Sequence, residues 1–150
     1  MKIAIGCDEN GYEMKEAIKA HLDELGVEYA DLGCGKDEQV LYPEIAHRVA
    51  VSIMEGKYDR GILICGTGLG MAITANKIPG IRAATCHDVY SAERARKSNN
   101  AQIITFGAQV IGTVLANKLV DVWLASEFAG GRSQPKVDLI DEIDCQYRKR

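Results

Sequence analysis

The chain has 150 residues, of which 18 are Lys or Arg and 21 are Asp or Glu, so its formal net charge is −3 at pH 7. This length suits a single domain over residues 1–150, and the charge excludes the broad basic surface that binding to nucleic acid requires. No window is apolar for long enough to span a membrane and no secretory leader opens the sequence, so we expect a cytoplasmic protein that binds no membrane.

Short runs rich in β-branched residues alternate along the chain with segments of helical periodicity. The runs lie at 2–6, 27–32, 61–65, 81–86 and 102–107, and the helical segments lie at 12–25, 43–55, 68–77, 90–98, 109–125 and 135–147. Strands that alternate with helices in this way form βαβ units, in which the strands are parallel. The pattern therefore predicts an α/β fold built on a parallel sheet.

The cysteine pattern bears on both disulfides and metals. The five cysteines are odd in number, widely spaced and free of any C-x-x-C pair. This pattern argues against a disulfide framework and against a zinc site. We therefore expect reduced thiols and no metal.

Polar and reactive residues follow the predicted strands at the points where the strands end. Asp8 and Glu9 come after the first strand, Cys65 closes the third, and His87 follows the fourth. Ligands bind outside the carboxyl ends of the strands in open parallel sheets. The sequence therefore predicts a site at this edge of the sheet.

The loop after the third strand combines a cysteine with three glycines. Gly66, Gly68 and Gly70 allow backbone N–H groups to turn inward ahead of a predicted helix, which makes an anion-binding site. The same positive field favours the thiolate form of Cys65. A thiolate beside an anion hole can act as a nucleophile or as a base.

Other interpretations of this loop are weaker. Its G-x-G-x-G spacing after the third strand matches a dinucleotide-binding turn poorly, and no Walker phosphate loop is present. Cysteine phosphatases have an arginine where this chain has Met71, and His21 and His47 lie on predicted helix surfaces, away from a thiol partner. The structural alternative for Cys65 is a small buried residue at a tight turn.

Five segments in order along the chain identify a family. They read "GCDENGYEMK" from residue 6, "LYPEIA" from 41, "GILICGTGLGMAITANKIPGIRAA" from 61, "YSAERARKSNNAQIITFGAQVIG" from 90 and "FAGGR" from 128. Together they resemble the type B ribose-5-phosphate isomerases, a family that includes the galactose-6-phosphate isomerase subunits. The resemblance implies a Rossmann-like three-layer sandwich with a five-stranded parallel sheet. It also implies isomerisation of aldose and ketose phosphates without metal or cofactor, in an obligate homodimer with active sites between the subunits.

The resemblance places the chemistry in the glycine loop. Cys65 matches the base that moves a proton between C1 and C2 through a cis-enediolate, and Thr67 matches the hydroxyl that assists it. The amides of Gly66, Gly68 and Gly70 would stabilise the enediolate oxygen.

The resemblance also implies substrate-binding residues. Asp8 matches a sugar-binding aspartate, and Tyr42 matches a tyrosine at the rim of the site. Asn99 matches an asparagine supplied by the partner subunit, and Arg132 matches a phosphate-binding arginine. Asp8 could instead cap the first helix, Tyr42 could serve in packing, and Arg132 could be a solvated surface charge.

Four expected substrate-binding positions depart from the family's pattern. Glu9 and Ser98 stand where the family has histidines, of which the second opens the sugar ring, and Gln109 and Lys136 stand where it has arginines. Lysine keeps the charge without the forked geometry of arginine, and glutamine loses the charge, so the phosphate must be held differently. Glu9 would repel a phosphate unless it points away or pairs with Lys136.

The missing ring-opening histidine bears on the substrate. A four-carbon sugar phosphate cannot close a furanose ring, so an enzyme for erythrose and erythrulose 4-phosphates does not need that histidine. His87 could instead supply the lost acid–base group, which would keep ribose 5-phosphate as the substrate. Two further hypotheses are a non-catalytic, sugar-phosphate-binding subunit of a hetero-oligomer and a nucleotide-binding module.

The segment 110–128 is apolar around more of its circumference than packing on one sheet face requires. We therefore expect part of this surface to meet another subunit. The expected assembly is a homodimer, able to pair further into a tetramer, in which the helix at 135–147 reaches the partner.

Overall fold

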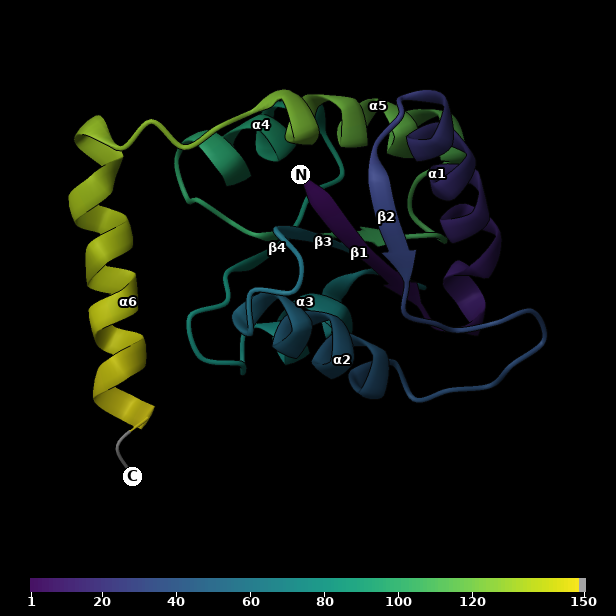
Figure 1. The fold of residues 1–150 in the computed structure, drawn as a ribbon, viewed down its shortest axis with the longest axis horizontal. Helices are drawn as coiled ribbons and strands as arrows, with labels where there is room; N and C mark the ends of the chain where they lie inside the picture. Colours follow the sequence, from purple (N-terminus) through teal and green to yellow (C-terminus); the bar gives the residue numbers. More distant parts are fainter. Residues whose placement is uncertain (149–150) are drawn as a thin grey trace.

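Strands and helices alternate along the chain in a computed structural model that describes residues 1–148 (Figure 1). The strands are β1 Lys2–Cys7, β2 Glu28–Asp31, β3 Arg60–Cys65, β4 Ala83–Thr85 and β5 Ile103–Gly107. The helices are α1 Tyr12–Glu24, α2 Tyr42–Met54, α3 Leu69–Ala75, α4 Val89–Lys97, α5 Thr113–Ala125 and α6 Gln134–Arg148. Short 3-10 turns at Glu9–Gly11 and Gly131–Ser133 precede α1 and α6.

The five strands pair in parallel in the order β2-β1-β3-β5-β4, which confirms the predicted sheet. The central strand β3 is buried along its whole length, and its Ile62 pairs with Ile5 on one side and Ile104 on the other. Continuous apolar strands are typical of parallel sheets that are covered on both faces. The same register places Cys65 beside Gly107 at the carboxyl ends of the strands.

Two helical layers cover the sheet. Helices α1, α4 and α5 lie on one face, and α2 and α3 lie on the other (Figure 1). Trp123 and Phe106 belong to the core of the first face, and Val49 and Met71 belong to the core of the second. Because each helix buries an apolar stripe at helical spacing, the result is the predicted three-layer sandwich.

Two predicted element boundaries are wrong. The helix predicted at 109–125 begins only at Thr113, because the N–H groups of Val110 and Ile111 both donate to the carbonyl of Gly107 and form a turn. The strand predicted at 81–86 shortens to Ala83–Thr85, the only residues of that run that pair with β5.

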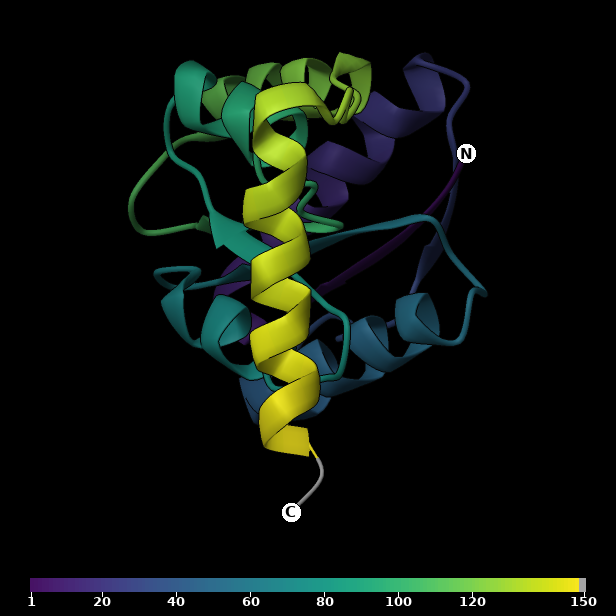
Figure 2. The ribbon, with the colours of Figure 1, turned by 90° about the vertical axis from the view of Figure 1, so that its left-hand side faces the viewer.

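Helix α6 stands apart from the sandwich, on the side of the sheet that ends in β4 (Figures 1 and 2). Polar contacts hold it there: Asp141 accepts a hydrogen bond from Arg82 at 2.5 Å, and Asp144 accepts one from the N–H of Gly80 at 2.8 Å. Three of its apolar side chains are exposed, namely Leu139, Ile140 and Ile143. The helix therefore presents an apolar surface that its own chain does not cover.

Candidate active site

Cys65 ends the central strand, and a tight turn brings a backbone amide back to its sulfur. The side chain is 5% exposed, and its Sγ accepts a hydrogen bond from the N–H of Gly68 at 3.1 Å. Gly68 has a φ of +77°, and a Cβ there would lie 2.8 Å from the carbonyl carbon of Phe106, so only glycine fits. An N–H directed at sulfur stabilises a thiolate, which suits Cys65 to the predicted role of base.

The loop after β5 holds the first part of this turn. The N–H of Ala108 donates to the carbonyl of Cys65 at 2.9 Å, and the N–H of Gln109 donates to the carbonyl of Gly66 at 3.0 Å. In a trans peptide the N–H points away from the carbonyl, so the amides of Gly66 and Thr67 face away from this loop. Across residues 1–148, neither amide has a protein acceptor. Both are available to an oxyanion.

Thr67 and Tyr42 lie on the open side of the loop. Thr67 is exposed and its Oγ1 accepts from the N–H of Leu69 at 3.3 Å, which leaves the hydroxyl hydrogen for another partner. The ring of Tyr42, at the start of α2, lies so close to Gly70 that a Cβ there would be 2.5 Å from it. The predicted rim tyrosine is therefore adjacent to the glycine loop.

Asp8 follows β1 and lies next to the end of β3. Its N–H donates to the carbonyl of Ile64 at 3.1 Å, and its Oδ1 accepts from the N–H groups of Asn10 and Gly11 at 3.0 and 3.2 Å. Burial raises the pKa of the Asp8 carboxyl, although these amides act in the opposite direction. Asp8 therefore caps the 3-10 turn Glu9–Gly11 and not helix α1, whose N-cap is Gly11, and the sugar-binding role remains a prediction that falls to Oδ2.

Glu9 and Gln109 also lie at this edge. Glu9 Oε2 accepts from the N–H of Val40 at 3.3 Å, so the carboxylate is directed at the loop before α2 and does not pair with Lys136 in the described chain. Gln109 is exposed, and its Oε1 would lie 3.0 Å from a Cβ at Gly66. Its amide therefore lies beside the glycine loop, where the family has a charged guanidinium.

His87 follows β4, and the backbone of β5 fixes its tautomer. Its Nε2 accepts from the N–H of Gly107 at 2.9 Å, which assigns the proton of the neutral ring to Nδ1. Burial lowers the pKa of His87, and the nearby Asp88 only partly opposes this effect. Nε2 is thus already occupied, which leaves Nδ1–H as the polar group that the ring can offer to a substrate.

The remaining predicted site residues lie toward the amino ends of the strands, at the opposite end from the glycine loop. Ser98 and Asn99 follow α4, which runs back from the carboxyl end of β4 toward the amino end of β5. Arg132 and Lys136 come after α5 in the chain. The last carbonyls of α5 accept hydrogen bonds from Arg60, the first residue of β3, so α5 ends near the amino ends of the strands. All four are at least partly exposed. One chain therefore does not bring them to the glycine loop.

Sequence reasoning missed two threonines that contact this loop. The hydroxyls of Thr85 in β4 and Thr105 in β5 both lie within hydrogen-bonding distance of the carbonyl of Gly68. The available signal was a hydroxyl in an otherwise apolar strand, since Thr105 is the one polar side chain of β5.

The other cysteines differ from Cys65 in their surroundings. All five are unpaired, and only Cys145 is exposed. Burial raises the pKa of Cys7 to about 12 and that of Cys86 to about 11, which keeps both thiols protonated. Within residues 1–148, no three His, Cys, Asp or Glu side chains are grouped so that they could hold a metal ion.

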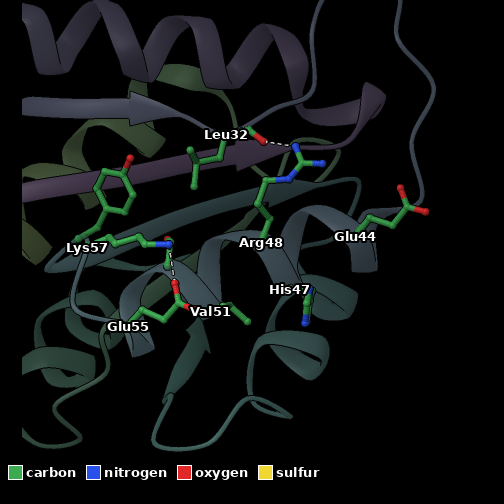
Figure 3. Close-up of a pocket in the computed structure, with 9 residues that line it drawn as sticks. Leu32, Glu44, His47, Arg48, Val51, Glu55 and Lys57 are labelled. Atoms are coloured by element: carbon green, nitrogen blue, oxygen red, sulfur yellow. Dashed lines mark hydrogen bonds and ion pairs between the residues drawn. The ribbon is translucent and has the colours of Figure 1, made fainter.

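A groove of about 690 Å³ runs along the outer side of α2 (Figure 3). Three of its charged side chains have partners: Arg48 donates to the carbonyl of Leu32 at 2.6 Å, and Lys57 pairs with Glu55 at 2.6 Å. None of the predicted site residues lines it. The candidate active site is therefore the glycine loop and not this groove.

A Rossmann-like sandwich with a thiol and a glycine turn at the carboxyl ends of its strands belongs to the α/β class and has the features of an anion-binding site. Residues 3–140 match the model of a family described as Ribose/Galactose Isomerase. The chain belongs to this family of isomerases, which confirms both the predicted family and the predicted class of enzyme.

Individual relatives agree with this assignment. The chain is 63% identical over 148 residues to a Listeria innocua protein described as Ribose-5-P isomerase B, covering 99% of this chain and 100% of the relative. It is 50% identical to the D-erythrulose-4-phosphate isomerase of Pectobacterium atrosepticum, covering 99% and 98%. The solved structure of Clostridium thermocellum ribose-5-phosphate isomerase B matches with a TM-score of 0.95 at 47% identity, covering 98% and 99%.

Proposed function

We propose that the chain interconverts the aldose and ketose forms of a short sugar phosphate, with Cys65 as the base. The thiolate takes the proton from C2 of the aldose, and the electron pair moves to O1 to give a cis-enediolate. The proton of O2 passes to O1 with the help of the Thr67 hydroxyl, and the thiol returns its proton to C1. The hydrogen bond from Gly68 to the Cys65 sulfur carries this proposal.

The unpaired amides of Gly66 and Thr67 support the same mechanism. Negative charge develops on the enediolate oxygen, and one preorganised donor at such a position is typically worth about 3–4 kcal/mol. No metal or cofactor enters the proposed steps. The relatives named above are all described as isomerases, which gives no support to a non-catalytic subunit.

We propose a four-carbon sugar phosphate, erythrose or erythrulose 4-phosphate, as the preferred substrate. Such a sugar has no furanose ring to open, and this chain has Ser98 where the family has its ring-opening histidine. His87 cannot offer Nε2 in its place, because that nitrogen accepts the N–H of Gly107. The Pectobacterium relative acts on D-erythrulose 4-phosphate by its description, which supports this substrate. The Listeria relative makes ribose 5-phosphate the competing one.

We propose that a second copy of the chain completes each site. Exposed apolar side chains surround the glycine loop: Leu69, Ile73, Val110 and Val114 are 55%, 63%, 55% and 85% exposed. An apolar surface of this kind marks a protein contact. A second copy could bring its Asn99 and Arg132 to this surface, and the exposed apolar side of α6 is the expected arm that reaches it.

We place the enzyme in the cytoplasm. The unpaired thiols fit a reducing compartment. No helix within residues 1–148 is both long and apolar enough to cross a bilayer.

The test is an initial-rate comparison of ribose 5-phosphate with D- and L-erythrulose 4-phosphate. We expect a tetrulose phosphate to turn over faster, and Cys65→Ala to lower kcat by at least about 10²–10⁴-fold, the usual contribution of a positioned base. Cys145→Ser, which changes an exposed thiol on α6, is the matched control and should keep its rate. Full activity in Cys65→Ala would overturn the mechanism, and faster turnover of ribose 5-phosphate would overturn the substrate.

A further inference from the structure

A chain of two hydroxyls, one of them fully buried, ends on the turn that follows Cys65. Thr105 is fully buried in β5, and its Oγ1 lies 2.8 Å from the carbonyl oxygen of Gly68. The Oγ1 of Thr85, in the neighbouring strand β4, lies 2.7 Å from that of Thr105 and 3.3 Å from the same carbonyl. Each hydroxyl has one hydrogen, so the shortest arrangement runs from Thr85 to Thr105 to Gly68.

Neither packing nor helix formation explains these hydroxyls. The carbonyl of Gly68 already accepts the N–H of Ala72 at 3.2 Å, so it has a backbone partner without them. Valine would fill the position of Thr105 with the same volume, in a strand that is otherwise apolar. A buried hydroxyl kept under these conditions points to a requirement of the turn itself.

The turn needs this additional contact because of Gly68. Gly68 permits the left-handed φ but does not enforce it, because glycine has the widest choice of conformations. The amides after β5 hold the carbonyls of Cys65 and Gly66, and the Thr105 hydroxyl supplies the third fixed point, at Gly68. The Gly68 N–H lies in the peptide before this residue and its carbonyl in the peptide after it, and the two planes are joined by the φ and ψ of Gly68. Holding the carbonyl therefore restricts these two angles while the N–H lies 3.1 Å from the Cys65 sulfur.

We infer that Thr105, reinforced by Thr85, is a positioning residue for catalysis: it fixes Gly68 so that the Gly68 amide stays directed at the sulfur of Cys65. The inference rests on the proposed role of Cys65 as the base. In this arrangement the single hydrogen of the Thr85 hydroxyl is directed at Thr105 Oγ1, 2.7 Å away, rather than at the Gly68 carbonyl, 3.3 Å away. Thr85 therefore acts through Thr105, whose hydrogen bond to Gly68 it polarises.

The test is a set of steady-state measurements with the preferred substrate. Thr105→Val should lower kcat about tenfold and leave KM within about twofold, because the substitution disturbs the turn and leaves the substrate contacts unchanged. The acidic limb of the kcat profile should move to higher pH, and Thr105→Ser should restore both properties. Thr85→Val should have a smaller effect, and the double valine variant should equal Thr105→Val alone.

Ile103→Val, in the same strand, is the matched control, since it makes a buried cavity without changing a hydrogen bond. It should lower the melting temperature and leave the pH profile unchanged. An unchanged kcat in Thr105→Val, additive effects of the two threonines, or an equal kcat loss in Ile103→Val would overturn the inference. Cys65→Ala separates the two proposals: its full activity refutes the proposed base, whereas its inactivity beside a normal Thr105→Val refutes only the positioning role.

Discussion

His87 is confined to one tautomer and one charge state at neutral pH. Its Nε2 accepts the N–H of Gly107, which an imidazolium cannot do because both of its nitrogens are donors. Burial lowers the pKa of His87 as well, so both effects oppose protonation in the folded chain.

We predict that His87 makes stability depend on pH. The unfolded chain binds this proton near the ordinary pKa of 6.5, and the folded chain binds it only at lower pH. The unfolded state therefore holds more protons below that value, so stability that is present above pH 6.5 is lost as the pH falls through the folded pKa. Urea unfolding at roughly pH 8 and roughly pH 5 checks this.

The comparison is His87→Asn, whose side-chain oxygen can still accept from Gly107. This variant should lose less stability on acidification than the unmodified protein, measured at the same protein concentration. Equal losses would show that another group carries the pH dependence.

At the scale of the elements, Arg60, the first residue of β3, caps the carboxyl end of helix α5. The guanidinium of Arg60 donates to the carbonyls of Trp123 and Ser126 and to the carboxylate of Glu127, at 2.9, 3.1 and 2.6 Å. Arg60 is 4% exposed, whereas the Glu127 side chain is 71% exposed. The forked cation thus supplies donors to carbonyls at the end of α5, where few backbone N–H groups remain.

We predict that Arg60→Leu lowers the free energy of unfolding by about 3 kcal/mol or more, because the Ser126 carbonyl loses its donor and the Trp123 carbonyl keeps only the N–H of Ser126. Glu127→Gln should cost less than about 1 kcal/mol, since its carboxylate is exposed to water. Urea unfolding of both variants checks the prediction. Similar losses in the two would assign the stabilisation to the exposed carboxylate instead.

The strands and helices could be predicted from the sequence because the pattern that marks each of them is local. Hydrophobic periods of two and of 3.6 residues located the strands and helices, and the strand ends located Asp8, Cys65 and His87 at one edge. The contact of Arg60 with Ser126 spans 66 residues of chain, and that of Thr105 with Gly68 requires β5 to lie beside β3. Such contacts depend on the strand order, which periodicity does not contain.

At the scale of the whole molecule, the proposed second copy predicts complementation. Cys65→Ala and Arg132→Ala should each inactivate the enzyme, but a heterodimer of the two has one intact site. Random pairing makes half of the dimers mixed, so co-expression should restore about a quarter of the unmodified activity. Initial rates of the co-expressed, purified protein measure this.

The matched control pairs Cys65→Ala with Asp8→Ala. These residues lie at the same edge of the sheet, so every site in that heterodimer keeps a defect and no activity should return. Recovery in the control, or none in the Cys65 and Arg132 pair, would contradict shared sites.

The polarity of the sheet also bears on the symmetry of such an assembly. Each chain carries Cys65 at one end of its strands and Arg132 toward the other, so in the proposed shared sites each chain both offers and needs half of a site. Units of this kind can join head to tail without limit, or they can close on themselves. Only a two-fold axis lets the same neighbour receive one half and return the other. A closed pair, with as many sites as chains, is therefore the smallest assembly in which no half is left over and no filament can grow.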